Sequence, residues 1–275
     1  MSTPPPQFHS RIWLEEASPD DPFTAERCYC SGYDVYGEII KHASYIEYLY
    51  LLFCGERPDA ASCRALEILA LALANPGPRN PAVHAAMSAG VGGSPAAAAL
   101  IAALAAGAGA AGGSREIYRC MEAWEAHPQT LTPWLAARQD GSKPEHPARR
   151  EVWPDTGYCP GFAPNTRSCP LPVRQTLALL TACLPTQRLA WLQEHRESVE
   201  EEIGSPLGMT GVAAAALLDL GFSPSQGEML TLLLGLPGAA AHALEQQEQG
   251  IRHFPFFGMN LLTDPEPPSR TPDTP

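Results

Sequence analysis

A stretch of 35 residues, 80–114, contains no formally charged side chain and consists mainly of Ala and Gly. Its length would allow a membrane-spanning helix. Pro95 and the seven glycines of the stretch that lie before Pro95 or after Leu104 interrupt it, however, and small side chains let helices approach closely. The stretch therefore favours a buried central helix, packed on neighbouring helices or on a partner subunit, in a protein without a membrane span.

Helical patterning extends over most of the remaining chain. Apolar residues recur at three- and four-residue spacing in 59–74, and Asn75-Pro-Gly-Pro78 ends that pattern. Residues 114–126 predict another helix, with Ser114 as its cap and Glu116 in a solvated first turn. Four later helical segments begin at or next to a proline, which suits a first helical turn: 171–184, 185–202, 206–222 and 224–249. No repeat or strand pattern is evident, so the predicted fold class is all-α.

The charge balance excludes some classes of partner. The 275 residues include 18 Lys and Arg against 30 Asp and Glu, a net charge of −12, whereas nucleic acid and anionic membrane both require a basic surface. Residues 1–7 are rich in proline and show no signal-peptide pattern. We therefore expect a cytoplasmic protein with reduced thiols and with no nucleic-acid or membrane partner.

Two features of the sequence leave their interpretation open. Cys28-x-Cys30 could form a zinc site with Cys159 and Cys169, but paired C-x-x-C spacing is lacking, and buried small apolar side chains are the alternative. Residues 129–168 are rich in Pro, Gly, Arg and Trp without a period, which predicts a loop-dominated segment. Residues 263–275 are predicted to be a disordered tail, because 264–275 hold five prolines and no large apolar side chain.

Several segments together resemble the citrate synthase superfamily. Gly32-Tyr-Asp-Val35 and the later 48–58 segment, which ends in Gly-Glu-Arg-Pro, are similar to its N-terminal signature. Gly238-Ala-Ala-Ala-His-Ala-Leu-Glu-Gln246 resembles its GxxAHxxEQ helix, and 251–255 matches the segment after it. The short chain and Asn75-Pro-Gly-Pro78 are most similar to the citryl-CoA lyase branch, and the resemblance covers about residues 11–262.

The resemblance implies a two-lobed, all-α fold with ligands in a cleft between the lobes. The large lobe would comprise 1–114 and 223–262, and the small lobe would comprise 115–222. It also implies a homodimer in which central helices of the two subunits pack together. The Ala and Gly stretch lies where such a helix belongs in the family.

Family enzymes make or break the bond between an acetyl-CoA methyl group and a keto-acid carbonyl, with a catalytic Asp and two His. The first His position corresponds to Ala111 in the citrate synthase pattern and to Pro76 in the lyase pattern. The second corresponds to Pro164, and Thr210 stands where the Asp is expected. None of these side chains can act as an acid or base near neutral pH.

The family's substrate-binding arginines are partly retained. Arg167 and Arg252 match two positions that bind carboxylates, whereas Gly235 replaces a third. The loop around Asn165-Thr-Arg167 is shorter than usual, which puts the coenzyme A contact there in doubt. His84 and Asp155 are possible replacement catalytic groups, and Cys159 is a weaker candidate. His242 belongs to the shared helix motif and is interpreted as structural.

These residues predict a catalytically degenerate homologue that binds a coenzyme A thioester or a carboxylate, with no tightly bound cofactor and no metal. One alternative is an active CoA-thioester lyase or synthase with replaced catalytic groups. A second alternative is a non-catalytic subunit that assembles with an intact homologue.

Overall fold

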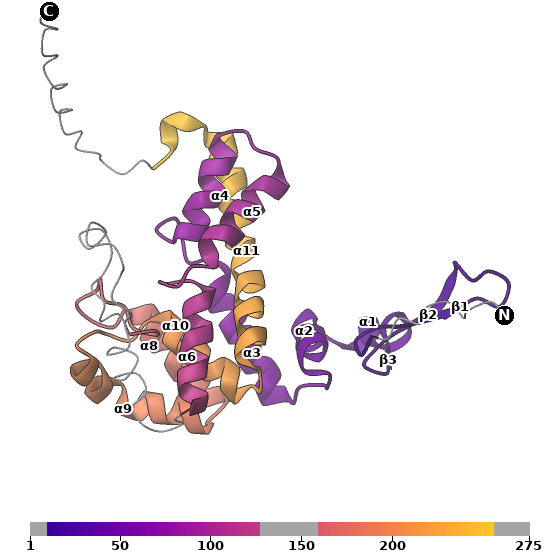
Figure 1. Cartoon of the computed structure of the whole chain (residues 1–275), viewed down its shortest axis with the longest axis horizontal. Coiled ribbons are helices and arrows are strands. Elements are labelled where there is room, and N and C mark those ends of the chain that lie inside the picture. Colours follow the sequence, from indigo (N-terminus) through magenta and orange to yellow (C-terminus); the bar gives the residue numbers. More distant parts are fainter. Residues whose placement is uncertain (1–9, 127–158, 256–275) are drawn as a thin grey trace, which may run out of the picture.

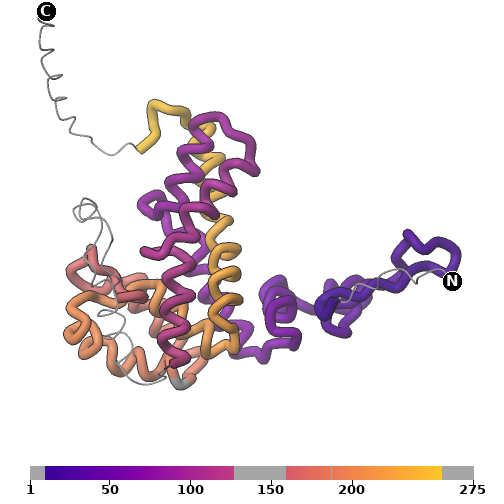
Figure 2. The backbone as a smooth tube through the Cα atoms, in the orientation of Figure 1, coloured from indigo at the N-terminus to yellow at the C-terminus, as the bar shows by residue number. Residues whose placement is uncertain are grey.

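The computed structural model describes residues 10–126 and 159–255. A body of packed helices carries an N-terminal arm, residues 10–54, that projects away from it (Figures 1 and 2). The predicted all-α class is confirmed. The predicted tail at 263–275 lies outside the described residues, as do residues 127–158, which include Asp155.

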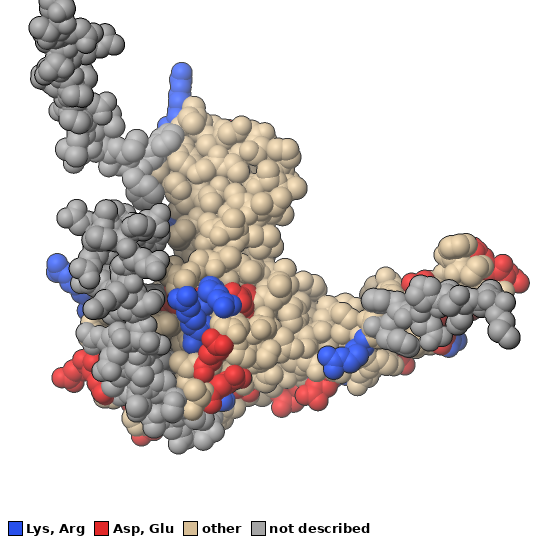
Figure 3. Space-filling view, viewed as in Figure 1, with Lys and Arg blue, Asp and Glu red and all other residues tan. Residues whose placement is uncertain are grey.

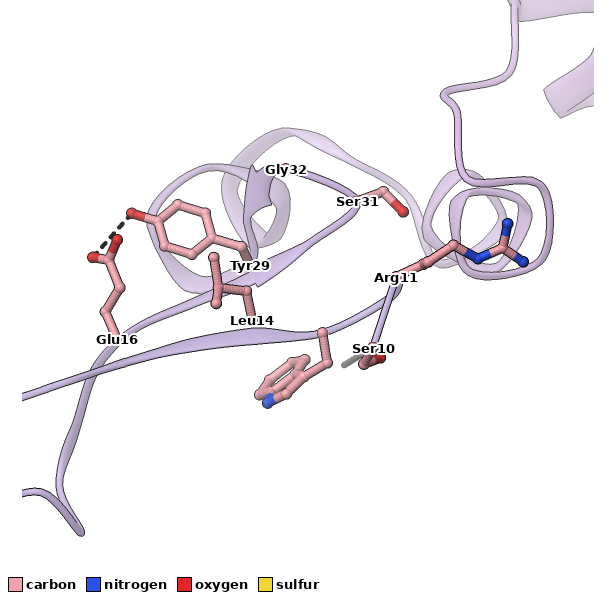
Figure 4. Close-up of a pocket in the computed structure, with 8 residues that line it drawn as sticks. Ser10, Arg11, Leu14, Glu16, Tyr29, Ser31 and Gly32 are labelled. Atoms are coloured by element: carbon pink, nitrogen blue, oxygen red, sulfur yellow. Dashed lines mark hydrogen bonds between the residues drawn. The ribbon is translucent and has the colours of Figure 1, made fainter. Parts of the chain in front are cut away.

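The arm begins with a small antiparallel sheet of β1 (Leu14–Ala17), β2 (Ala25–Cys30) and β3 (Tyr33–Asp34), in the order β1-β2-β3. A two-residue turn at Ser31 and Gly32, both with positive φ, joins β2 to β3. The expectation of no strands is wrong here. All of β1 and half of β2 are exposed, so no buried face imposes the alternating pattern by which a strand is recognised. Figure 4 shows β1 and β2 side by side, with the Tyr29 hydroxyl 3.4 Å from Glu16.

Three short helices continue the arm towards the body: η1 (Val35–Ile39), α1 (Ile40–His42) and α2 (Tyr45–Cys54). Ser44 and Glu47 form a reciprocal capping box at the start of α2, and Gly55 ends it in a left-handed conformation. Helix α3 (Ala60–Ala74) starts where Asp59 accepts a hydrogen bond from the Ser62 amide and stops before Pro76.

The charge-free stretch forms two helices rather than the single buried helix expected. These are α4 (Pro81–Val91) and α5 (Ala96–Gly107), and the turn between them contains Gly93 with positive φ. Helix α4 packs on α11 (Pro224–Gln249) so closely that a Cβ on Gly90 would overlap the carbonyl oxygen of Ala243. Close packing by small residues is therefore confirmed for α4, whereas α5 leaves one face exposed, including Ile101.

The rest of the body contains α6 (Ser114–Ala126), α8 (Leu171–Cys183), α9 (Gln187–Ile203), α10 (Met209–Asp219) and, after α11, the short η3 (Ile251–His253). Helix α11 contacts α3, α4, α5, α6 and α10. The main hydrophobic core includes Leu66, Leu177 and Leu217, and a second cluster around Met87 joins α4, α5 and the later part of α11. The predicted division into lobes at 114 and 222 stays a prediction.

Charged side chains are unevenly distributed over the surface. In the view of Figure 3 they gather on the lower body and along the arm, and the α4–α5 end is almost free of them. Among the described residues, only α11 is long and apolar enough to cross a membrane, judged by length and composition alone. Helix α11 packs against five other α-helices, and 39% of its most apolar window is buried.

Candidate functional site

A cavity of about 420 Å³ lies where α3 ends and where α6 and α10 begin, and α11 forms part of its wall. Four of the positions that the sequence resemblance matches to catalytic or substrate-binding positions line it: Pro76, Ala111, Thr210 and Gly235. These positions are up to 159 residues apart in sequence. The fold therefore gathers them around one cavity. Pro164 is exposed and is not among the lining residues.

The cavity is apolar and uncharged among the described residues, because no Asp, Glu, His, Lys or Arg lines it. Three of its polar side chains have structural partners. Asn75 accepts from the Gly77 amide, Asn80 accepts from the Ala82 amide at the start of α4, and Thr231 donates to the Gly227 carbonyl within α11. Ser114 and Thr210 are the remaining polar lining residues.

Glu116 lies behind the cavity wall and is completely buried. Its carboxylate accepts hydrogen bonds from the Gly112 amide, from the Gly161 amide at 2.9 Å and from the Thr210 hydroxyl at 2.6 Å. It thereby connects the turn before α6, the segment around Gly161 and the start of α10. Donors on all sides match the acceptor-only chemistry of a carboxylate.

The expectation of a solvated Glu116 is wrong. Its side chain folds back to satisfy an amide that precedes the helix, as acidic side chains in a first helical turn often do. A glutamate two residues after the first residue of a helix was the available signal, but its long-range partners at positions 161 and 210 were not visible in the sequence. Ser114 also differs from expectation, because its hydroxyl is buried and makes no hydrogen bond among the described residues.

The start of α10 is held in place by residues 161–163. The Gly208 amide donates to the Gly161 carbonyl at 2.8 Å, and the Ala163 amide donates to the Pro206 carbonyl at 2.8 Å. A Cβ on Gly211 would lie 2.6 Å from the Gly161 carbonyl oxygen, so glycine is needed at this contact. These contacts fix Thr210 in the cavity wall.

The candidate replacement groups within the described residues, His84 and Cys159, do not line the cavity. His84 lies on α4 and packs edge-on against Phe254, with ring centroids 5.2 Å apart. Asp155 lies outside the described residues. Cys159 is buried and also does not line the cavity. The prediction that His84 or Cys159 faces the ligand therefore finds no support in this arrangement.

Arg167 lines a different cavity, of about 640 Å³, which shares no lining residue with the first. Two further arginines and three glutamates line that cavity, and Arg196 is paired with Glu197 and Glu200. Arg252 lies in η3, at the far end of α11. Figure 1 places η3 at the top of the body and α8, which follows Arg167, at the lower left. The described chain thus does not bring the two predicted carboxylate-binding arginines together.

The surroundings of the cysteines and of His242 are those of structural residues. Cys28 and Cys30 lie on β2 in the arm, and no group of three His, Cys, Asp or Glu in the described ranges could hold a metal ion. Burial raises the pKa of the Cys120 thiol well above its usual value and that of Cys169 to about 11. The His242 Nε2 lies 3.1 Å from Asn75 Oδ1, which joins α11 to the end of α3.

Sequence comparison finds no matching family model and no curated protein with significant similarity. Structural comparison does find similar proteins. Citryl-CoA lyase from Hydrogenobacter thermophilus has a TM-score of 0.70 at 16% identity, with 96% of this chain and 97% of that chain covered.

Two ATP citrate lyase structures are also similar. The enzyme from Methanosaeta concilii, in complex with citryl-CoA, has a TM-score of 0.69 at 15% identity, covering 90% of this chain and 40% of that one. The enzyme from Methanothrix soehngenii, in complex with citrate and coenzyme A, has a TM-score of 0.67 at 16% identity, covering 96% and 43%. At these identities the comparisons establish the fold.

Proposed function

We propose that this citrate synthase-like chain binds a coenzyme A thioester or a carboxylate-bearing ligand without catalysing the lyase or synthase reaction. The observation that supports the proposal most directly is the 420 Å³ cavity, which Pro76, Ala111 and Thr210 line without any ionisable side chain among the described residues. Proton abstraction next to a thioester requires a base within hydrogen-bonding reach of the substrate. No described lining residue offers one.

The structural neighbours support coenzyme A as the ligand class. One ATP citrate lyase structure holds citryl-CoA, and the other holds citrate and coenzyme A. In our proposal the ligand binds reversibly and no cofactor is held tightly. Arg167 and Arg252 remain the proposed carboxylate-binding residues, although they lie apart in this chain, so contact of both with one ligand would require a second subunit or a movement of the chain.

The main alternative is an active CoA-thioester lyase or synthase whose catalytic groups come from other positions. Two assays separate it from the proposal: condensation of acetyl-CoA with oxaloacetate, and cleavage of citryl-CoA. We expect no turnover of either by the purified full-length protein. Turnover that His84→Ala or Asp155→Ala abolishes would overturn the proposal and identify the replacement group.

Binding is tested separately from turnover. Isothermal titration calorimetry and thermal-shift titration with CoA, acetyl-CoA, oxaloacetate and citrate should detect at least one ligand of the thioester or carboxylate class. If none of the four binds, the ligand-binding proposal fails, and a protein–protein role is left for this fold.

We also propose that the chain forms a homodimer through its charge-poor helical face. Met229, Leu233 and Leu244 are 54%, 42% and 60% exposed, and their spacing places them along one side of α11. Ile101 on the neighbouring α5 is 65% exposed. Large apolar side chains grouped on one face favour an interface. Assembly with an intact homologue through the same face is the alternative, and co-purification with such a homologue would favour it. We retain the expectation of a cytoplasmic location.

A further inference from the structure

We infer that the 420 Å³ cavity selects an uncharged, carboxamide-like or alcohol-like group on an apolar chain and disfavours a carboxylate. This inference rests on the proposed function only in taking the cavity as the ligand site. It specifies a ligand group that differs from the carboxylates expected from the resemblance.

The side chains that line the cavity offer no cationic partner to an anion. Its described lining residues are mostly Ala, Gly, Leu and Pro, without Lys, Arg or His, and Gly235 leaves open the position of one expected arginine. A carboxylate placed there would lose its hydration without gaining a cationic partner among these residues. The carboxylate of Glu116, which the Thr210 hydroxyl contacts, adds a further unfavourable interaction with a second negative charge.

Thr210 presents a hydrogen-bond acceptor. Its hydroxyl proton is directed to Glu116 Oε1 at 2.6 Å, so its oxygen has only lone pairs left for a ligand. Thr210 also lines the cavity. A ligand group that meets Thr210 must therefore donate a hydrogen bond, which an ionised carboxylate cannot do.

Ser114 supplies the complementary group. It is 4% exposed and borders the cavity, and its hydroxyl oxygen, which neighbouring atoms enclose, has no hydrogen-bond partner among the described residues. A ligand reaches this oxygen only when the wall around it shifts. An unsatisfied buried hydroxyl is unfavourable, and a ligand that accepts its proton removes that cost. A carboxamide offers both an N–H for Thr210 and a carbonyl oxygen for Ser114, and the amides of a pantetheine arm belong to this class.

Hexanamide and hexanoate test the inference, because they have the same chain length and differ chiefly in charge. Ligand-observed NMR and calorimetry at neutral pH with the full-length protein should show hexanamide binding about tenfold more tightly than hexanoate. Thr210→Val should weaken hexanamide binding about tenfold, and Ser114→Ala should weaken it in the same direction. Thr210→Ser should retain binding, since it keeps the hydroxyl.

Two further variants keep the test informative if Thr210→Val folds poorly. Thr181→Val makes the same chemical change on α8, where the hydroxyl contacts the Leu189 carbonyl away from the cavity, and should leave binding unchanged. Gly235→Arg introduces a cation at a position where an added Cβ would meet no atom within 4 Å, and should shift the preference towards hexanoate.

Equal or tighter binding of hexanoate by the unmodified protein would overturn the inference, as would hexanamide binding that survives both Thr210→Val and Ser114→Ala. Binding of CoA or acetyl-CoA without binding of hexanamide would also overturn it while leaving the proposed function in place. Binding of hexanamide without any of the thioesters or carboxylates would support the inference and reject the proposed function.

Discussion

At the scale of single residues, Glu116 joins three separate parts of the chain through one carboxylate. Its acceptor oxygens satisfy two backbone amides and one hydroxyl in a region from which water is excluded. Buried donors that lose their acceptor cost far more than exposed ones. The carboxylate therefore contributes to stability, although it does not line the cavity.

Glu116→Gln should lower the free energy of unfolding by about 2 to 3 kcal/mol, because one carboxamide oxygen cannot replace two carboxylate oxygens as acceptors. Urea denaturation followed by circular dichroism measures the change. Glu125→Gln, an exposed position on the same helix, is the matched control and should alter stability by less than about 0.5 kcal/mol. Equal stability of the two variants would contradict the role assigned to Glu116.

The raised pKa of the Tyr50 phenol predicts that the folded protein loses stability at alkaline pH. Burial raises the pKa of its phenol to about 12, and the hydroxyl donates to the Leu220 carbonyl at 2.9 Å. The unfolded chain releases this proton near pH 10, before the folded chain does. The Tyr50 contribution is thus complete below about pH 10 and falls as the pH rises towards 12.

Thermal unfolding measured from pH 8 to pH 11.5 checks this prediction. Tyr50→Phe should lower stability by about 1 kcal/mol at pH 8 through the lost hydrogen bond. It should then show a smaller further decline at alkaline pH than the unmodified protein. Parallel declines would show that Tyr50 does not titrate as predicted.

At the scale of secondary-structure elements, the crossing of α4 and α11 depends on the absence of a side chain. Gly90→Ala should destabilise the protein by about 1 to 3 kcal/mol, because a methyl group there meets the immobile backbone of Ala243. Chemical denaturation measures the effect. Gly235→Ala is the control within α11, and should be neutral or stabilising, because nothing lies within 4 Å of its added Cβ and Ala favours a helix.

The helices could be predicted well from the sequence, because the signals that define a helix lie within that helix. The four predicted segments after residue 170 correspond to α8, α9, α10 and α11, because proline starts and apolar periodicity act within single helices. The charge-free stretch was less predictable, since Ala and Gly define no apolar face that would show where one helix ends. The exposed sheet of the arm lacked any periodic signal.

The candidate site was only partly predictable. Motif similarity selected Pro76, Ala111, Thr210 and Gly235, which the fold places around one cavity. It did not separate them from Arg167, which lines another cavity. The bond from Thr210 to Glu116 spans 94 residues, and such a contact leaves no trace in local spacing.

At the scale of the whole molecule, the arm and the charge-poor face suggest an assembled state. Phe23 is 95% exposed and Tyr45 is 74% exposed in the single chain, in addition to the exposed face of α11. Size-exclusion chromatography with light scattering should give a mass twice that of the 29.5 kDa chain. Leu233→Glu should shift the equilibrium towards the monomer, whereas Glu125→Gln should not. A monomer at tens of micromolar would contradict the proposed dimer.

Two of the hydrogen bonds to Glu116 come from backbone amides, which has a consequence for how this protein can evolve. The amides belong to Gly112 and Gly161, both with positive φ, which favours glycine at these two positions. The bonds come from the backbone, so they do not depend on which side chain stands at a neighbouring position. Neighbouring positions such as Ala111 can therefore exchange reactive groups for inert ones while the chain keeps its architecture. In this part of the fold, side-chain chemistry at the cavity can thus change without loss of the hydrogen bonds that hold the wall together.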